Sequence, residues 1–399
     1  MQNKLIFKKI PIDGYNEGMK IVGCDKEWLN AKIVSSNISN EEMLKILKSY
    51  GVKEILVEYI SETVALISKE DEISEKSLSN LFLSDLEFVK NIYPVLLSEL
   101  KEIFQSVKSQ RFDPEKVDVI TEKINSSSVK NSGFIVNITK YSQNEEYLYN
   151  HSINVALLSN ISAKNLGYNE KVTLEMTKGG LLHDIGKLFI DTDIVNKKGK
   201  LNEHEFAEVK KHPILGYKFL SEYKCESEIV LRIVLEHHER YNGKGYPRRL
   251  SGNNISPYAK IASILDAYDA LTNDTTYREA MSQEEAIEII KQSAGAEFSK
   301  NVSDILLNFI KNNTLGKVVR LDSDEVGIIV KEGINKKQPL VLIVKDSEGK
   351  FVKPYIYDLN SYNAMTGMPY KQIISFYTKK EIDFNPVQIL LDNISLLNN

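Results

Sequence analysis

Residues 176–187 read MTKGGLLHDIGK, and this stretch decides how the middle of the chain is interpreted. Its apolar and small residues have helical spacing up to the pair His183-Asp184, and Gly186 marks the end of that helix. In both directions from this stretch the pattern stays helical, from about residue 130 to about residue 310, with only short polar breaks. We therefore predict a large all-α domain in which the His-Asp pair stands at a helix end.

The histidines gather around this pair. The chain has only six, all between positions 151 and 238, and five of them fall where successive helices would direct them toward one another. The sixth, His204, is expected to be a surface residue. A later helix adds an aspartate on a face of small residues, which would let a compact cofactor approach closely. The predicted cluster consists of His151, His183, Asp184, His212, His237, His238 and Asp266.

Such a cluster needs a partner. A single histidine on an apolar face is more often a satisfied core residue, so a plain helical domain with structural histidines is the alternative for each residue taken alone. Burying all these imidazoles together without partners would cost about 1–3 kcal/mol each. A metal offsets that cost, and nitrogen and oxygen ligands favour Fe, Mn, Zn or Ni. Seven ligands exceed the needs of one ion, so we predict two ions with Asp184 as the bridge.

Two metal ions about 3.5–4 Å apart suit displacement at phosphorus. They generate hydroxide from a shared water and neutralise the phosphate oxygens. The residues alone therefore predict phosphoester hydrolysis, although nothing in their spacing identifies guanine in the substrate.

Composition excludes several classes of protein. The chain has 399 residues, 42% of them hydrophobic, and a formal net charge of −4. That length suits two or three domains, and the charge gives no general reason to bind a nucleic acid polymer or an anionic membrane. Cys24 and Cys225 are the only cysteines, which excludes a disulfide framework or a multi-thiolate metal site. No apolar run has the length of a signal-peptide core or a membrane span, so the expected location is cytoplasmic.

Three motifs resemble the HD-GYP family, which comprises bacterial HD-superfamily phosphodiesterases that linearise and hydrolyse cyclic di-GMP. They are HDIGK at 183–187, HHERYNGKGYP at 237–247 and DAYDALT at 266–272. The resemblance covers about 145–300, and more loosely 131–310. It implies the helical HD fold, with one metal among His151, His183, Asp184 and Asp266, and with Asp184 bridging to a second metal held by His212, His237 and His238.

The resemblance also implies an activity, the hydrolysis of cyclic di-GMP to pGpG and/or GMP by attack of a metal-bridging hydroxide. Lys187 and Asp184 would be the catalytic residues, because an ammonium beside the phosphate can stabilise developing charge or protonate the leaving oxygen. The cofactors would be two divalent metal ions, Fe in the first place and Mn as the alternative. The residues expected at the substrate are Lys187, Gly243, Gly245, Tyr246, Pro247 and Arg278.

The sequence departs from the family at positions that bear on the site. Tyr147 stands where some members have a glutamate that binds a third metal, so two metals are expected. Thr275 replaces an arginine that reaches a substrate phosphate in relatives, and Asn242 replaces the usual aspartate. Two alternatives therefore stay open: a phosphodiesterase for another cyclic dinucleotide such as cyclic GMP-AMP, and a low-activity cyclic-dinucleotide sensor that acts through partner proteins.

The flanking regions predict separate modules. Residues 1–80 alternate strand-like runs with one short amphipathic helix, and they resemble the small α/β domain of unknown function that often precedes an HD-GYP domain. The full prediction is multidomain: this α/β module at 1–80, a helical connector at 81–130, the all-α catalytic domain at 131–311, and a β-rich module at 312–399 with strands at 316–320, 325–331, 339–345 and 351–357. The terminal modules are candidate sites for signalling partners, and a homodimer is left open.

Overall fold

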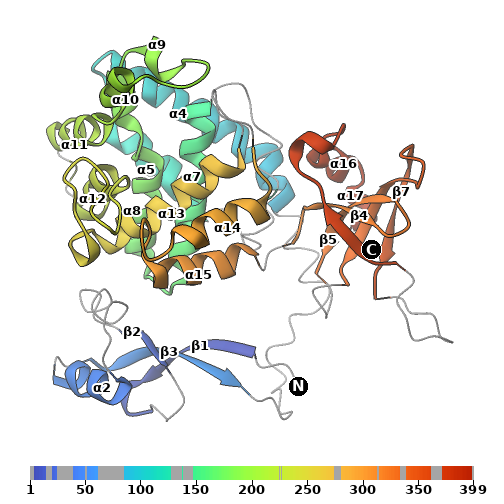
Figure 1. Cartoon of the computed structure of the whole chain (residues 1–399), viewed down its shortest axis with the longest axis horizontal. Coiled ribbons are helices and arrows are strands. Elements are labelled where there is room, and N and C mark those ends of the chain that lie inside the picture. The colour runs from blue at the N-terminus through green and yellow to red at the C-terminus, as the bar shows by residue number, and fades with distance from the viewer. Residues whose placement is uncertain are drawn as a thin grey trace. The chain divides into compact units, whose positions relative to one another are not determined.

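The computed structural model describes two compact units, Met1–Glu72 and Ile73–Asn399 (Figure 1). None of the helices among the described residues is both long enough and apolar enough to span a bilayer. The described residues are 4–14, 20–24, 39–49, 52–61, 85–126, 137, 147–223, 225, 227–273, 280–311, 314–332, 338–360 and 371–397.

The first unit is a small α/β module, as the sequence predicts. Its strands are β1 (Lys4–Pro11), β2 (Lys20–Cys24) and β3 (Glu54–Ser61), which form an antiparallel sheet in the order β1-β3-β2. Helix α2 (Asn40–Ser49) is amphipathic. Leu47 on this helix and Ile55 in the sheet are both completely buried. The short amphipathic helix expected in this module is therefore present.

The second unit opens with two helices that pack on the rest of its helical domain. A π-helical turn (Phe88–Ile92) leads into α4 (Tyr93–Lys108), and α5 (Pro114–Ser126) follows. Pro114 occupies the first helical position and Asp113 accepts a hydrogen bond from the Glu115 N–H, which is the helix start that the sequence indicates. The apolar stripes of both helices are buried in the main core.

The remainder of the helical domain surrounds α7, in which every residue from Asn150 to Ala163 is buried. A 3₁₀ turn (Ile185–Phe189) follows α8 and carries the chain toward α11. The all-α prediction for this region is confirmed. Its helices are α7 (Tyr147–Asn165), α8 (Glu170–Leu182), α9 (Thr192–Val195), α10 (Glu203–Val209), α11 (His212–Glu222), α12 (Glu228–Glu236), α13 (Pro257–Thr272), α14 (Gln283–Ser293) and α15 (Lys300–Lys311).

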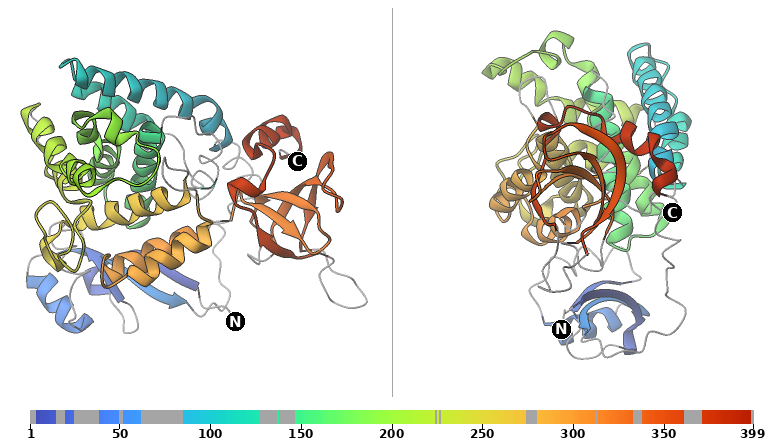
Figure 2. Two further views of the ribbon diagram at one scale, coloured as in Figure 1. Left: turned by 45° about the horizontal axis from the view of Figure 1, so that its top comes forward. Right: turned by 90° about the vertical axis from the view of Figure 1, so that its right-hand side faces the viewer.

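The C-terminal region is a curved antiparallel sheet followed by two short helices (Figure 2). The strand order is β7-β6-β5-β4-β8, and the central strands β5 and β6 are almost wholly buried. The β-rich prediction is confirmed, although β8 and both helices were not expected from the sequence. The elements are β4 (Val318–Leu321), β5 (Val326–Lys331), β6 (Leu340–Lys345), β7 (Phe351–Asp358), β8 (Ile373–Phe376), α16 (Pro386–Asp392) and α17 (Ile394–Leu397).

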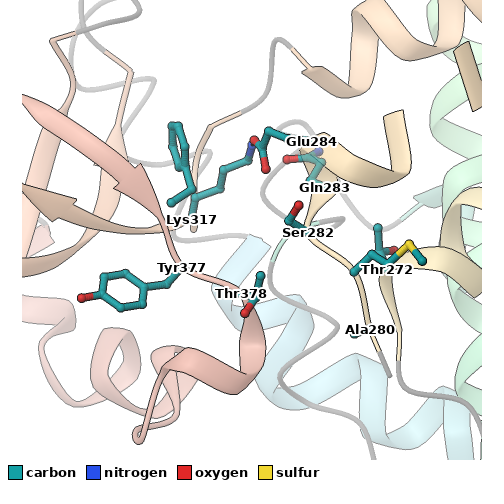
Figure 3. A pocket seen from close by; sticks show the side chains of 10 residues that line it. Thr272, Ala280, Ser282, Gln283, Glu284, Lys317, Tyr377 and Thr378 are labelled. Carbon is teal, nitrogen blue, oxygen red and sulfur yellow. The ribbon is translucent and has the colours of Figure 1, made fainter. Parts of the chain in front are cut away.

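A small pocket lies where this sheet meets α13 and α14 (Figure 3). Lys317 from the sheet is almost buried, and its Nζ lies 3.0 Å from Glu284 Oε1 on α14. The space beside this ion pair amounts to about 20 Å³, which is room for about one water molecule. The amide oxygen of Gln283 faces no hydrogen-bond partner among the described residues, so such a water would satisfy it.

Candidate metal centre

Five segments of the helical domain bring the predicted cluster together. They are α7, the turn after α8, the start of α11, the turn after α12, and α13, which contribute in that order His151, His183 with Asp184, His212, His237 with His238, and Asp266. Their donor atoms form two groups, each with its atoms within 4.8 Å of one another: His151, His183 and Asp266, and Asp184, His212, His237 and His238. His204 is exposed and belongs to neither group.

Gly186 allows the turn after α8 to approach α11. A Cβ at this position would lie 1.9 Å from the His212 carbonyl oxygen and 2.7 Å from the Gly216 nitrogen, distances that no side chain tolerates. The two backbones can therefore touch only because position 186 has no side chain. This contact sets Asp184 beside His212.

The imidazole rings are oriented by hydrogen bonds to main-chain carbonyls. The Nδ1 atoms of His183, His212 and His237 lie 2.7–3.1 Å from the carbonyl oxygens of Gly180, Val209, and Ile233 and Val234. A ring that donates Nδ1–H is left with a lone pair on Nε2. The Nε2 atoms of His212 and His237 lie 3.1 Å apart, and those of His183 and His151 lie 3.2 Å apart. For His212 and His237, two such lone pairs face each other, and they repel unless a cation lies between them.

Asp184 divides its two carboxylate oxygens between the two groups. Oδ1 lies 3.2 Å from His212 Nε2 and 4.0 Å from His237 Nε2. Oδ2 lies 3.4 Å from His183 Nε2 and 3.7 Å from His151 Nε2. The side chain is buried, and Oδ1 accepts no hydrogen bond from any described residue. A buried carboxylate oxygen without a donor is the kind of atom that a metal ion satisfies.

The electrostatics keep four of the ligands, His212, His237, Asp184 and Asp266, in the protonation state that metal binding needs. Burial lowers the pKa of His212 to about 4 and that of His237 to about 3, so both rings are neutral at pH 7. Burial raises the pKa of Asp184, but Lys187 and His183 outweigh this effect and hold it well below its usual range. Asp266 likewise stays ionised, because His151 outweighs burial and lowers its pKa.

His151 differs from the other rings in its surroundings. Burial lowers its pKa, but hydrogen bonds to Asp266 and Asp269 outweigh burial and raise the pKa to about 10. Without a metal this ring is therefore protonated on both nitrogens. A bound cation would replace the Nε2 proton, between His151 Nε2 and the Asp266 carboxylate, which are 3.1 Å apart. The ring of Tyr147 stacks on it with centroids 5.1 Å apart, so this position covers the site instead of adding a ligand.

The cluster is open to solvent on one side. The side chains of His238, Asp266 and Lys187 are 19%, 13% and 21% exposed, whereas the side chains of the other members are 2% exposed or less. The Lys187 ammonium lies 2.6 Å from Asp184 Oδ2. Lys187 therefore belongs to the exposed side of the cluster and contacts its buried shared carboxylate.

The predicted substrate loop borders the same opening. The Tyr246 ring packs against the His238 ring, with centroids 4.7 Å apart, and the Tyr246 N–H donates to the His238 carbonyl. Gly245 is required here, because a Cβ would lie 2.3 Å from the Arg240 nitrogen. Gly243 adopts a positive φ of 76°, which favours glycine. Pro247 follows Tyr246 in this loop, whereas Thr275 and Arg278 lie outside the described residues.

Two buried glutamates at the end of α12 hold this loop, and sequence reasoning gave them no role. Glu239 accepts hydrogen bonds from the main-chain N–H groups of Arg248 and Leu250, at 2.7 and 2.9 Å. Glu236 accepts one from the Ser256 N–H at 2.8 Å and pairs with Arg232. The contacts to main-chain N–H groups join residues 9 to 20 positions apart, so only the place of the glutamates in the histidine motif could have pointed to them.

Asp269 is the third residue that sequence reasoning left without a role. Its Oδ2 lies 2.7 Å from His151 Nδ1, and its Oδ1 accepts a hydrogen bond from Asn273 Nδ2 at 2.8 Å. The side chain is almost completely buried. Its position three residues after Asp266, on the same helix face, is the signal that could have found it.

Comparison with known proteins agrees with this picture. An HD domain model matches residues 136–302. The cyclic di-GMP phosphodiesterase PA4108 of Pseudomonas aeruginosa is 31% identical over 223 residues, which cover 56% of this chain and 54% of that protein. The cyclic di-GMP phosphodiesterase PdeB of Borreliella burgdorferi is 29% identical over 383 residues, 94% of each chain. The chain thus spans about half the length of the first relative and nearly all of the second.

Two further similarities are shorter or weaker. The 3′3′-cGAMP-specific phosphodiesterase 1 of Vibrio cholerae is 33% identical over 163 residues, which cover 41% of this chain and 38% of that protein. Among solved structures, an HD-type protein of Bdellovibrio bacteriovorus, Bd1817, matches with a TM-score of 0.46 and 18% identity, over 77% of this chain and 100% of that one.

The helical bundle and its histidine-aspartate cluster define an HD-domain protein. Within that class, the chain is similar to cyclic di-GMP phosphodiesterases, which agrees with the resemblance of its motifs to the HD-GYP family.

Proposed function

We propose that this protein is a metal-dependent phosphodiesterase that hydrolyses cyclic di-GMP to pGpG and/or GMP. The observation that carries the proposal is the convergence of seven donor side chains in two groups that share Asp184. The similarity to a cyclic di-GMP phosphodiesterase over 94% of both chains supports the choice of substrate.

The donor set fits a pair of divalent cations. One position would be held by His151, His183 and Asp266, the other by His212, His237 and His238, with one oxygen of Asp184 turned to each. When bound, such a pair supplies Lewis acidity toward phosphate oxygens and a nucleophilic hydroxide at neutral pH. We propose iron as the metal, with manganese as the alternative, because imidazole and carboxylate ligands suit both.

The residues of the chain would contribute charge and a proton. In the reaction a P–OH bond forms, the bond from phosphorus to the 3′ oxygen breaks, and the leaving oxygen takes up a proton. Lys187 borders the opening with its ammonium 2.6 Å from Asp184, so it is placed to stabilise the phosphate charge or to supply that proton. Asp184 would hold both cations at a fixed separation and keep Lys187 oriented toward them.

The loop after α12 would bind the nucleotide. Its glycines, Gly243 and Gly245, let the backbone pass close to the cluster, and Tyr246 with Pro247 presents an apolar surface beside His238. Arg278 stays a predicted substrate contact. Signalling partners for the terminal modules, a homodimer and a cytoplasmic location stay predictions as well.

A second candidate substrate is cyclic GMP-AMP. Three relatives with 32–34% identity over 148–163 residues are 3′3′-cGAMP-specific phosphodiesterases. Thr275 stands where the family has an arginine in the predicted substrate region, so the contacts to the substrate at this position would differ. The further alternative, a sensor that binds the nucleotide and turns it over slowly, would use the same site.

One experiment tests these options together. Protein prepared without oxygen is analysed for metal content and then incubated with cyclic di-GMP or 3′3′-cGAMP, and the products are separated by chromatography. We expect two metal ions per chain and conversion of cyclic di-GMP to pGpG or GMP. Faster turnover of 3′3′-cGAMP would change the substrate, and tight binding with little turnover by the metal-loaded protein would favour the sensor.

Two variants make this experiment specific to the cluster. Asp184→Asn should lower turnover by at least about 100-fold, because one shared carboxylate serves both metal positions. His204→Ala removes the one histidine outside the cluster and should leave both metal content and turnover unchanged. Absence of metal from the wild-type protein, or full activity of the Asp184 variant, would refute the proposal.

A further inference from the structure

The two donor groups are not equivalent, because their histidines are supported differently. His183, His212 and His237 each direct Nδ1 at neutral main-chain carbonyls. Among the rings whose Nδ1 forms a hydrogen bond, only His151 directs it at a carboxylate, that of Asp269, at 2.7 Å. The group of His151, His183 and Asp266 therefore contains a ring whose Nδ1 is hydrogen-bonded to a carboxylate side chain.

Helix α13 contacts both nitrogens of this ring. Asp266 Oδ1 lies 3.1 Å from His151 Nε2, and one turn later Asp269 Oδ2 lies 2.7 Å from Nδ1. Asn273, a further turn along, donates to Asp269 Oδ1 at 2.8 Å and fixes the rotation of that carboxylate. These three side chains, two on α13 and one at its C-cap, thus leave His151 a single orientation, with Nε2 directed at the cluster.

A carboxylate behind an imidazole acts on metal binding in two ways. It accepts the Nδ1–H and so fixes the tautomer whose Nε2 lone pair faces the metal, and its charge makes that nitrogen a stronger donor. A neutral carbonyl fixes the tautomer but adds no full charge. Since Asp184 is shared by both groups, the difference between them rests on the other ligands and their supports.

We propose that Asp269 is a positioning residue that makes the metal position of His151, His183 and Asp266 the tighter of the two. This position would then fill first, and the position of His212, His237 and His238 would fill second. The inference rests on the proposed dinuclear site, but it concerns the order of loading and not the substrate.

The experiment is a titration of metal-stripped, full-length protein with Mn²⁺, in which the free ion is measured by electron paramagnetic resonance. The wild type should bind two equivalents in two separable phases. Asp269→Asn keeps the shape of the side chain and removes its charge. It should weaken the tighter phase by about 10–100-fold and leave the weaker phase in place.

A matched control separates metal positioning from general stability. Asn160 is buried on the same helix as His151, and its side chain donates to Asn125 and Thr177, away from the cluster. Asn160→Leu should lower the melting temperature of the metal-free protein without changing either phase. Asn273→Ala should weaken the tighter phase less than Asp269→Asn does, because Asp269 keeps its charge.

The outcomes distinguish the two proposals. A folded Asp269→Asn protein with wild-type isotherms, or one in which both phases weaken equally, would overturn the role of Asp269. Two wild-type equivalents of equal affinity would overturn the order of loading and leave the proposed function intact. A wild-type protein that binds no Mn²⁺ or Fe²⁺ would overturn both.

Discussion

The Nε2 atoms of His212 and His237 lie 3.1 Å apart in the interior, and both rings already use Nδ1 to donate to main-chain carbonyls. Neither ring can donate to the other, because each offers only a lone pair at Nε2. His183 also uses Nδ1 to donate to a main-chain carbonyl, and its Nε2 faces the other oxygen of Asp184. A cation between the two Nε2 atoms of His212 and His237 would satisfy both lone pairs.

Replacement of Lys187 should separate chemistry from metal binding. Lys187→Met removes the ammonium beside Asp184 and should lower kcat by about 100–1,000-fold, because the charge that develops on the phosphate loses one stabilising group. Metal content, measured by elemental analysis, should stay at two ions per chain. Lys197→Met, which breaks an ion pair with Glu205 elsewhere in the domain, is the control and should leave kcat unchanged. Equal kcat in both variants would show that Lys187 takes no part in the reaction.

Gly186 should be intolerant of any side chain. In Gly186→Ala the new Cβ would meet the His212 carbonyl at 1.9 Å, so the turn after α8 must move away from α11. We expect a loss of about 3 kcal/mol or more in the free energy of unfolding, together with weaker metal binding. Gly216→Ala faces contacts of 3.0–3.2 Å at the same junction and should cost about 1 kcal/mol. Chemical denaturation of the two variants would contradict the argument if their stabilities were equal.

Most of the metal cluster could be predicted because its members are rare and lie on strongly periodic helices. Six histidines in 399 residues leave few ways to arrange five of them on inward faces. The helical period then places residues far apart in sequence on one side of a bundle, as with His151 and Asp266, whose side chains meet at 3.1 Å.

The supporting carboxylates could not be predicted in the same way. Asp269 and Glu236 are acids in helices and Glu239 follows a helix end, where a solvated side chain is the ordinary expectation. What makes them different is burial against partners such as His151 Nδ1 or the N–H of Arg248, and these partners are fixed only by the packing of other helices. Strand β8 was missed for a related reason, since its short, mostly exposed residues form a strand by pairing with β4.

The stability of the metal-free protein should be greatest near pH 6.5–7. His212 and His237 have folded-state pKa values of about 4 and 3, below the unfolded value of 6.5, so the unfolded state binds more protons and stability falls as the pH drops below 6.5. At pH 5.5 each ring should lower the free energy of unfolding by about 1 kcal/mol relative to its value near pH 7. His151 has a pKa raised to about 10, so its contribution to the stability of the folded protein is complete below pH 6.5 and is lost as the pH rises toward 10.

Melting temperatures of the metal-free protein from pH 5 to 9 check this dependence. In a variant with Gln at both 212 and 237 the decline below pH 6.5 should be shallower, because two of the titrating groups are gone. Saturating Mn²⁺ at pH 7 should raise the melting temperature, by the equivalent of about 2.7 kcal/mol at 100 times Kd. A flat profile between pH 7 and 5.5 would contradict the neutral state of the buried rings.

The loop that follows the paired histidines should depend on Glu239 for its position. The Glu239 carboxylate accepts the N–H groups of Arg248 and Leu250, and an amide in its place can accept only with one of its two terminal atoms. Glu239→Gln therefore leaves one main-chain N–H facing another donor, which should displace Tyr246 from the His238 ring. We expect KM for cyclic di-GMP to rise about tenfold, the equivalent of one lost hydrogen bond to a charged group. Metal content should stay at two ions, since no ligand is altered.

Glu297→Gln, at a half-exposed residue paired with Arg240 beside the same loop, is the matched control and should leave KM unchanged. A normal KM in Glu239→Gln would mean that the loop keeps its position without this carboxylate, whereas loss of metal would mean that Glu239 supports the histidines themselves.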